Sequence, residues 1–110
     1  MKASDILDLN DLKTKVVKVK EWNREVTVQE LGLDDGIKMF DLVRNLDDDK
    51  VVITAESIAQ VVAWGVIDPE THERVFSDDD VADLAQKSRK ALMFLYEKIM
   101  ALSGGDAAKN

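Results

Sequence analysis

The stretch VVKVKEWNREVTVQEL at residues 16–31 decides the fold, because it predicts a β-hairpin near the start of the chain. Val17 and Val19 alternate with lysines, and Val26 and Val28 repeat the same period of two. This alternation is typical of strands that bury one face. The segment between the two valine pairs is therefore predicted to turn and bring them together.

A helical middle is predicted to follow the hairpin. Asp34 and Asp35 suit a helix N-terminus, where the helix dipole favours negative charge. The apolar residues at helical spacing behind them are Met39, Leu42, Val43 and Leu46. A polar break is expected at residues 45–50, after which Thr54 can cap a second helix that ends at Gly65.

A second, shorter hairpin is predicted after this helix. The dipeptide Asp68-Pro69 favours a turn, and it lies between the apolar pairs at 66–67 and 75–76. His72 falls in this turn, so we expect it to adopt an unusual backbone angle rather than to act as a general base.

Two helices are predicted to close the chain. Ser77 is an N-cap candidate, and the aspartates at 78–80 fit the first helical turn. Ser88 can cap the next helix, which Gly104 would end. The remaining residues, 105–110, are predicted to form a disordered tail.

Length and composition limit the classes of protein to which this chain can belong. The 110 residues suit a single domain, predicted at 1–104, and the order of elements predicts an α+β fold. The net charge of −7 argues against nucleic-acid binding, and the short lysine-rich strip is interpreted as a solvated strand. The lysines of this strip are Lys13, Lys15, Lys18 and Lys20. No apolar run approaches the roughly 20 residues of a membrane span, and acidic residues interrupt any signal peptide, so a cytoplasmic location is expected.

The residue types that commonly serve catalysis or metal binding do not form a recognisable site in this sequence. Cysteine is absent, and His72 is the single histidine. Ser77 and Ser88 suit caps better than nucleophiles, and the aspartate runs lack the glycine and the downstream glutamate of a calcium loop. The sequence therefore predicts a protein without catalytic residues, metal or cofactor.

The last helix carries more apolar residues than one buried face needs. Its residues Leu92, Leu95, Tyr96, Ile99 and Leu102 lie together, and Ala91, Met93 and Met100 widen their arc to roughly 200°. A single core face needs only ~100°. Phe94 lies outside this arc and is expected to reach solvent. Met93, Phe94, Tyr96 and Met100 are therefore candidate partner-binding or self-association residues, although a wide intramolecular core would also account for the methionines.

The chain resembles the tail assembly chaperones of long-tailed bacteriophages and prophages over nearly its whole length. The resemblance is carried by two segments, each with a tryptophan beside a turn, and by the junction of the last two helices. Its residues are Glu21, Trp22, Trp64, Asp68, Pro69, Phe76, Ser77, Asp80, Lys87 and Ser88. The chain departs at Lys20 and Asn23, where related sequences often carry Pro and Gly, but Asn accommodates turn geometry almost as well as Gly. Residues 33–53 match poorly.

The resemblance implies a non-enzymatic role. Such chaperones bind the long, helical tape measure protein, help to recruit tail tube subunits in the host cytoplasm, and are not expected in the mature virion. Homo-oligomers are compatible with this role. The alternative is an acidic phage-encoded inhibitor that mimics nucleic acid and binds a host protein. Mimics array carboxylates over one face, whereas the acids here concentrate at helix starts and loops.

Overall fold

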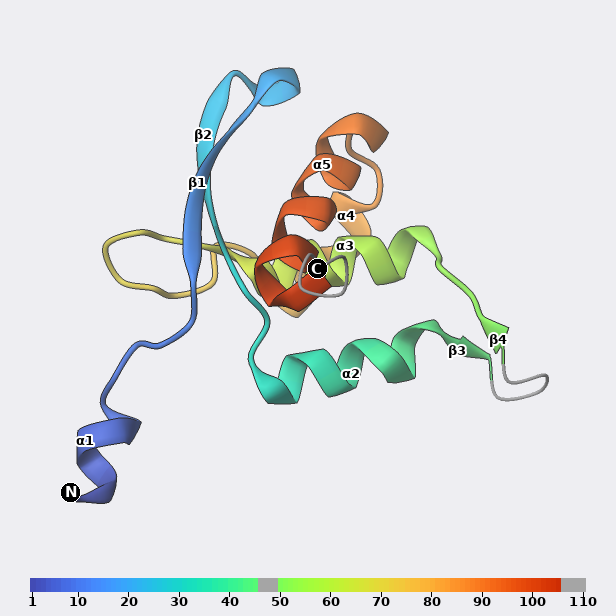
Figure 1. Cartoon of the computed structure of the whole chain (residues 1–110). Coiled ribbons are helices and arrows are strands. Elements are labelled where there is room, and N and C mark those ends of the chain that lie inside the picture. Colours follow the sequence, from blue (N-terminus) through green and yellow to red (C-terminus); the bar gives the residue numbers. More distant parts are fainter. Residues whose placement is uncertain (46–49, 106–110) are drawn as a thin grey trace.

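The computed structural model describes residues 1–45 and 50–105 and shows a small α+β domain, as the sequence predicts (Figure 1). The elements in chain order are α1 (Ala3–Leu7), β1 (Thr14–Val19), η1 (Lys20–Trp22), β2 (Arg24–Gln29), α2 (Leu33–Val43), β3 (Arg44–Asn45), β4 (Lys50–Val51), α3 (Ala55–Gly65), β5 (Val66–Ile67), η2 (Asp78–Asp80), α4 (Val81–Leu84), α5 (Arg89–Met100) and η3 (Ala101–Gly105). The predicted disordered tail comprises residues 105–110. Gly105 belongs to η3, and residues 106–110 lie outside the described residues.

The N-terminal hairpin confirms the prediction from the valine alternation. β1 and β2 pair antiparallel, with Val17 opposite Val26 and Val19 opposite Arg24. Val17, Val19 and the following Val28 are buried, whereas the lysines of the strip are exposed, as a half-buried strand requires. The tight turn ends at Asn23, whose φ of 51° lies in the left-handed region that Asn tolerates.

β5 extends this hairpin into a three-stranded sheet of order β1-β2-β5, a pairing that the sequence did not indicate. Val66 lies opposite Val28 and Ile67 opposite Thr27. The predicted second hairpin forms, but its return arm pairs through a single bridge between Ile67 and Arg74. β5 therefore contributes to the sheet of the first hairpin more than to a hairpin of its own.

The turn after β5 is held by its own polar groups. The Asp68 carboxylate accepts hydrogen bonds from the N–H groups of Glu70 and Thr71 at 2.8 and 3.2 Å. His72 has a φ of 62°, which confirms the predicted unusual backbone angle. The His72 N–H donates to the Asp68 carbonyl at 2.8 Å, so the turn closes on the residue that begins it.

α5 lies at the centre of the domain, where it contacts α3 as well as β1, β2 and η1 (Figure 1). Leu95 and Ile99 are fully buried there. Because α3 covers one side of α5 and the N-terminal hairpin covers another, most of its wide apolar arc packs within the domain. Most of this arc is therefore not surplus surface, and the exception is Met93.

α3 begins and ends where the sequence predicts. Its N-cap Thr54 accepts a hydrogen bond through Oγ1 from the Ser57 N–H at 3.1 Å. The helix ends at Gly65, but the glycine is required by packing rather than by a left-handed cap. A Cβ at Gly65 would lie 2.4 Å from Cδ1 of the buried Ile99.

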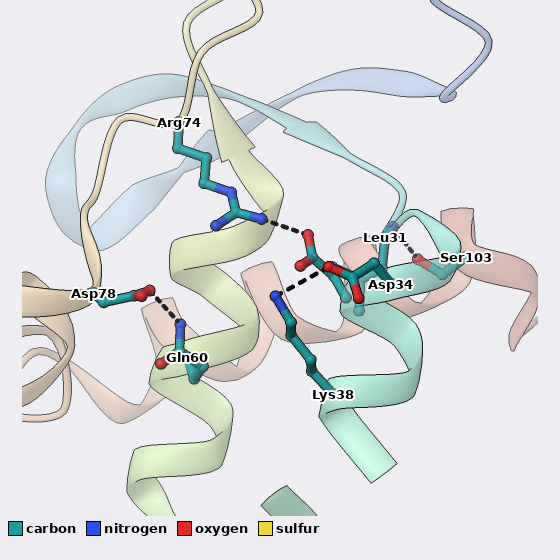
Figure 2. A network of polar contacts seen from close by, with 8 residues as sticks. Leu31, Asp34, Lys38, Gln60, Arg74, Asp78 and Ser103 are labelled. Carbon is teal, nitrogen blue, oxygen red and sulfur yellow. Dashed lines mark hydrogen bonds and ion pairs between the residues drawn. The ribbon is translucent and has the colours of Figure 1, made fainter. Parts of the chain in front are cut away.

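The end of α5 is fastened to the segment before α2. Gly104 adopts a φ of 101°, so the helix ends near the predicted residue. The Leu31 N–H donates to Ser103 Oγ at 2.8 Å (Figure 2). That hydroxyl in turn donates to the Ile99 carbonyl at 2.7 Å. This link and an ion pair between Arg74 and Asp35 hold the start of α2 to the domain.

Of the three longest helices, α2 is the least integrated into the core. It runs beside α3 and leads away to β3 and β4, which pair where the sequence suggested only a polar break (Figure 1). Met39 packs against the core as one half-buried contact, and α2 contains no buried residue. The expected apolar residue Leu46 and the aspartates at 47–49 lie outside the described residues.

Candidate functional site

The polar side chains singled out in the sequence lie at turns and helix starts in the part of the chain that the structure describes. No group of three or more metal-ligating side chains occurs among residues 1–45 and 50–105. His72 Nδ1 lies 3.0 Å from Asn10 Nδ2, on the surface. The Ser77 N–H donates to the Asp80 carboxylate at 2.8 Å, and the Ser77 hydroxyl lies 3.3 Å from the same oxygen. Ser77 and Asp80 thus form a helix start.

Ser88 likewise begins a helix, because its Oγ accepts from the Ala91 N–H at 3.3 Å. Asp78 accepts at 3.2 Å from the Gln60 side-chain amide, which connects the start of η2 to α3 (Figure 2). The aspartates of η2 therefore serve its N-terminus and its contact with α3.

Several of the residues that carry the resemblance meet beside the sheet. Trp22, Pro69 and Phe76 line one hollow of about 470 Å³ between the hairpin and the loop after β5. An adjoining hollow of about 400 Å³ continues past Trp22 and Phe76 to Lys87. Trp22 and Phe76 are half-buried and pack against the core. Trp64 is buried in α3 and does not join them.

The partner-binding candidates on α5 do not form one exposed surface. Phe94, Tyr96 and Met100 are half-buried and pack against the core. Met93 is also half-buried, but it lines a separate groove between α3 and α5. Phe94 packs against the core and keeps part of its side chain exposed, so it reaches solvent only in part, and Lys98 Nζ lies 5.4 Å from the centroid of its ring.

Phe94→Glu is accordingly expected to destabilise the fold rather than to weaken only an interaction with a partner. Placing a carboxylate against the core should lower the free energy of unfolding by about 2 kcal/mol. Chemical denaturation monitored by circular dichroism measures the change. An unchanged denaturation midpoint would contradict the packing of Phe94 against the core.

An apolar feature that sequence reasoning missed is a stripe on α2, formed by Leu33, Ile37 and Phe40. These side chains are 84%, 54% and 64% exposed. Their spacing of four and three residues places them on one side of the helix. The signal was present in the sequence, but the expected apolar face was built on Met39, Leu42 and Val43 instead. Of these, Met39 packs on the core and Leu42 is exposed.

The charges beside this α2 stripe are mainly acidic. Lys38 Nζ lies 3.0 Å from Asp34 Oδ2, and this hydrogen bond raises the pKa of Lys38 above its usual value (Figure 2). Asp35 pairs with Arg74, and Asp41 is exposed. α2 thus presents an apolar stripe on a helix of negative net charge.

A second apolar surface is the groove of about 470 Å³ between the start of α3 and the start of α5. Ile53, Ile58, Leu92 and Met93 supply its apolar lining, and Lys87 and Arg89 lie at its border. Its charge is opposite to that of α2.

Among the described residues, no helix has the length and apolar character needed to cross a bilayer. Comparisons with models of protein families, with curated proteins and with solved structures gave no match to this chain.

Proposed function

We propose that this protein is a tail assembly chaperone that binds the tape measure protein without catalysing a reaction. In this proposal it acts in the host cytoplasm, helps to bring tail tube subunits to the tape measure protein, and is left out of the virion. Two things support the proposal. The first is the resemblance carried by the Trp22 and Asp68-Pro69 segments, and the second is the exposed α2 stripe.

The α2 stripe is the observation that carries the proposal. A helix with one apolar face normally buries that face against its own domain. Here Leu33, Ile37 and Phe40 remain exposed on a helix that is fixed at its start by the Asp35–Arg74 pair and the Leu31–Ser103 hydrogen bond. A long helical client can lay its own apolar face along this stripe, as helices do in recognition grooves.

Charge supports the same arrangement. The chain carries 22 acidic and 15 basic residues, and the exposed Asp41 lies on the same helix as the stripe. A client helix with basic residues beside its apolar face would be attracted to this surface. The surplus negative charge would also keep a complex with an aggregation-prone client in solution.

Phe40→Asp is expected to weaken binding of the tape measure protein at least tenfold, because it removes the largest apolar side chain of the stripe and places a carboxylate against the apolar face of the client. The matched control is Leu9→Asp, since Leu9 is 59% exposed and lies outside α2. Co-expression with the tape measure protein, followed by size-exclusion chromatography and titration of the purified partners, measures both variants.

If both variants retain the tape measure protein equally well, the α2 stripe is not its binding surface. If the unaltered chain instead purifies from infected cells with a host nuclease and without tape measure protein, the alternative of an acidic inhibitor is favoured.

A further inference from the structure

We propose that the groove between α3 and α5 is a second docking site, which takes a short segment of a partner protein with apolar side chains flanked by Asp or Glu. The groove has about 470 Å³, within the range of about 300 to 1,000 Å³ typical of ligand sites. It shares no lining residue with the α2 stripe. The inference is independent of the proposed chaperone function.

The apolar lining of the groove explains why the ligand should carry apolar side chains. Ile53 is exposed, and Ile58 and Met93 are half-buried. Leu92 at the base is buried. Covering the exposed parts of these side chains removes apolar surface from water, and the unbranched Met93 can adapt to the shape of an inserted side chain.

The charged lining residues of the groove explain why the ligand should also carry Asp or Glu. The described lining residues include no Asp or Glu, although acids outnumber bases in the chain as a whole. Lys87 and Arg89 are exposed, and within residues 1–45 and 50–105 neither forms an ion pair. Two cations beside an apolar groove favour a ligand with carboxylates next to its apolar anchor, and they disfavour the basic helix that suits α2.

The test is a selection from a random twelve-residue peptide library displayed on yeast, with the full chain as the target. Methyl NMR of the protein then identifies the selected peptides that shift the Met93 and Ile58 methyl signals. Those peptides are expected to carry Asp or Glu beside aromatic or aliphatic residues. Their affinity should fall about fivefold in the double variant Lys87→Gln/Arg89→Gln, which corresponds to two partly screened ion pairs.

The control is Lys13→Gln/Lys15→Gln, which neutralises two exposed lysines far from the groove in sequence and should leave peptide affinity unchanged. The proposal is overturned if no selected peptide shifts the groove methyls, or if those that do are neutral or basic. It is also overturned if Lys87→Gln/Arg89→Gln changes the sedimentation of the free chain, since the groove would then hold a second copy.

Discussion

Replacing Gly65 with alanine is expected to lower the free energy of unfolding by about 2 to 3 kcal/mol, in the upper range for overpacked cores. The new Cβ would lie between 2.4 and 2.9 Å from three carbons of the Ile99 side chain. Ile99 is fully buried and the close atoms include both of its Cγ carbons, so relief of the clash requires repacking of the core. Alanine favours helices more than glycine does, but this gain of about 1 kcal/mol or less does not offset the clash. Thermal and urea unfolding followed by circular dichroism measure the loss.

A double-mutant cycle identifies the clash as the cause. Ile99→Ala removes all three carbons that the new methyl group would meet, and the added Cβ would fill part of the cavity left behind. The double variant Gly65→Ala/Ile99→Ala should therefore be more stable than the sum of the two single losses predicts. Additive losses would show that the glycine is required for another reason.

Leu95→Ala is expected to cost about 2 to 5 kcal/mol, the largest loss among the substitutions considered. Leu95 is fully buried on α5, between α3 and the hairpin, so its removal leaves a cavity where two layers meet. Since domains of this size are stable by about 5 to 15 kcal/mol, this loss is a large fraction of the total stability and should lower the melting temperature by many degrees.

The control is Leu42→Ala on α2, where the side chain is exposed and the loss should be within about 0.5 kcal/mol. Differential scanning calorimetry of the two variants beside the unaltered chain gives the comparison. Equal losses would contradict the position of Leu95 in the core.

Local signals predicted the local structure well. Alternation in Val17, Val19, Val26 and Val28 was enough for the hairpin, because the burial of one face enforces a period of two. The caps at Thr54 and Ser88 follow from side-chain oxygens that satisfy free N–H groups at helix starts, a requirement independent of the rest of the fold. His72 was assigned to the turn on equally local grounds.

Features that depend on distant parts of the chain could not be predicted. The pairing of Val66 with Val28 joins segments separated by α2 and α3, and nothing in either segment specifies the other. The width of the α5 arc was read correctly, but only the packed structure shows that both α3 and the hairpin cover it. The packing of Phe94 against the core could not be predicted for the same reason, since periodicity shows which residues share a face and not what lies against that face.

Because α2 is attached more weakly than the other long helices, it should open by itself more readily than α3 or α5. With no buried residue in this helix, its detachment breaks mainly the Asp35–Arg74 pair, the half-buried contact of Met39 and the interactions at the helix start. Gly36 lies in open space in its interior and lowers helix stability by about 1 kcal/mol relative to alanine. The amide hydrogens of α2 should consequently exchange with solvent through local opening, while those of α3 and α5 exchange only when the whole domain unfolds. A partner that binds the α2 stripe would then also slow this exchange, and part of its binding energy would be spent on holding the helix closed.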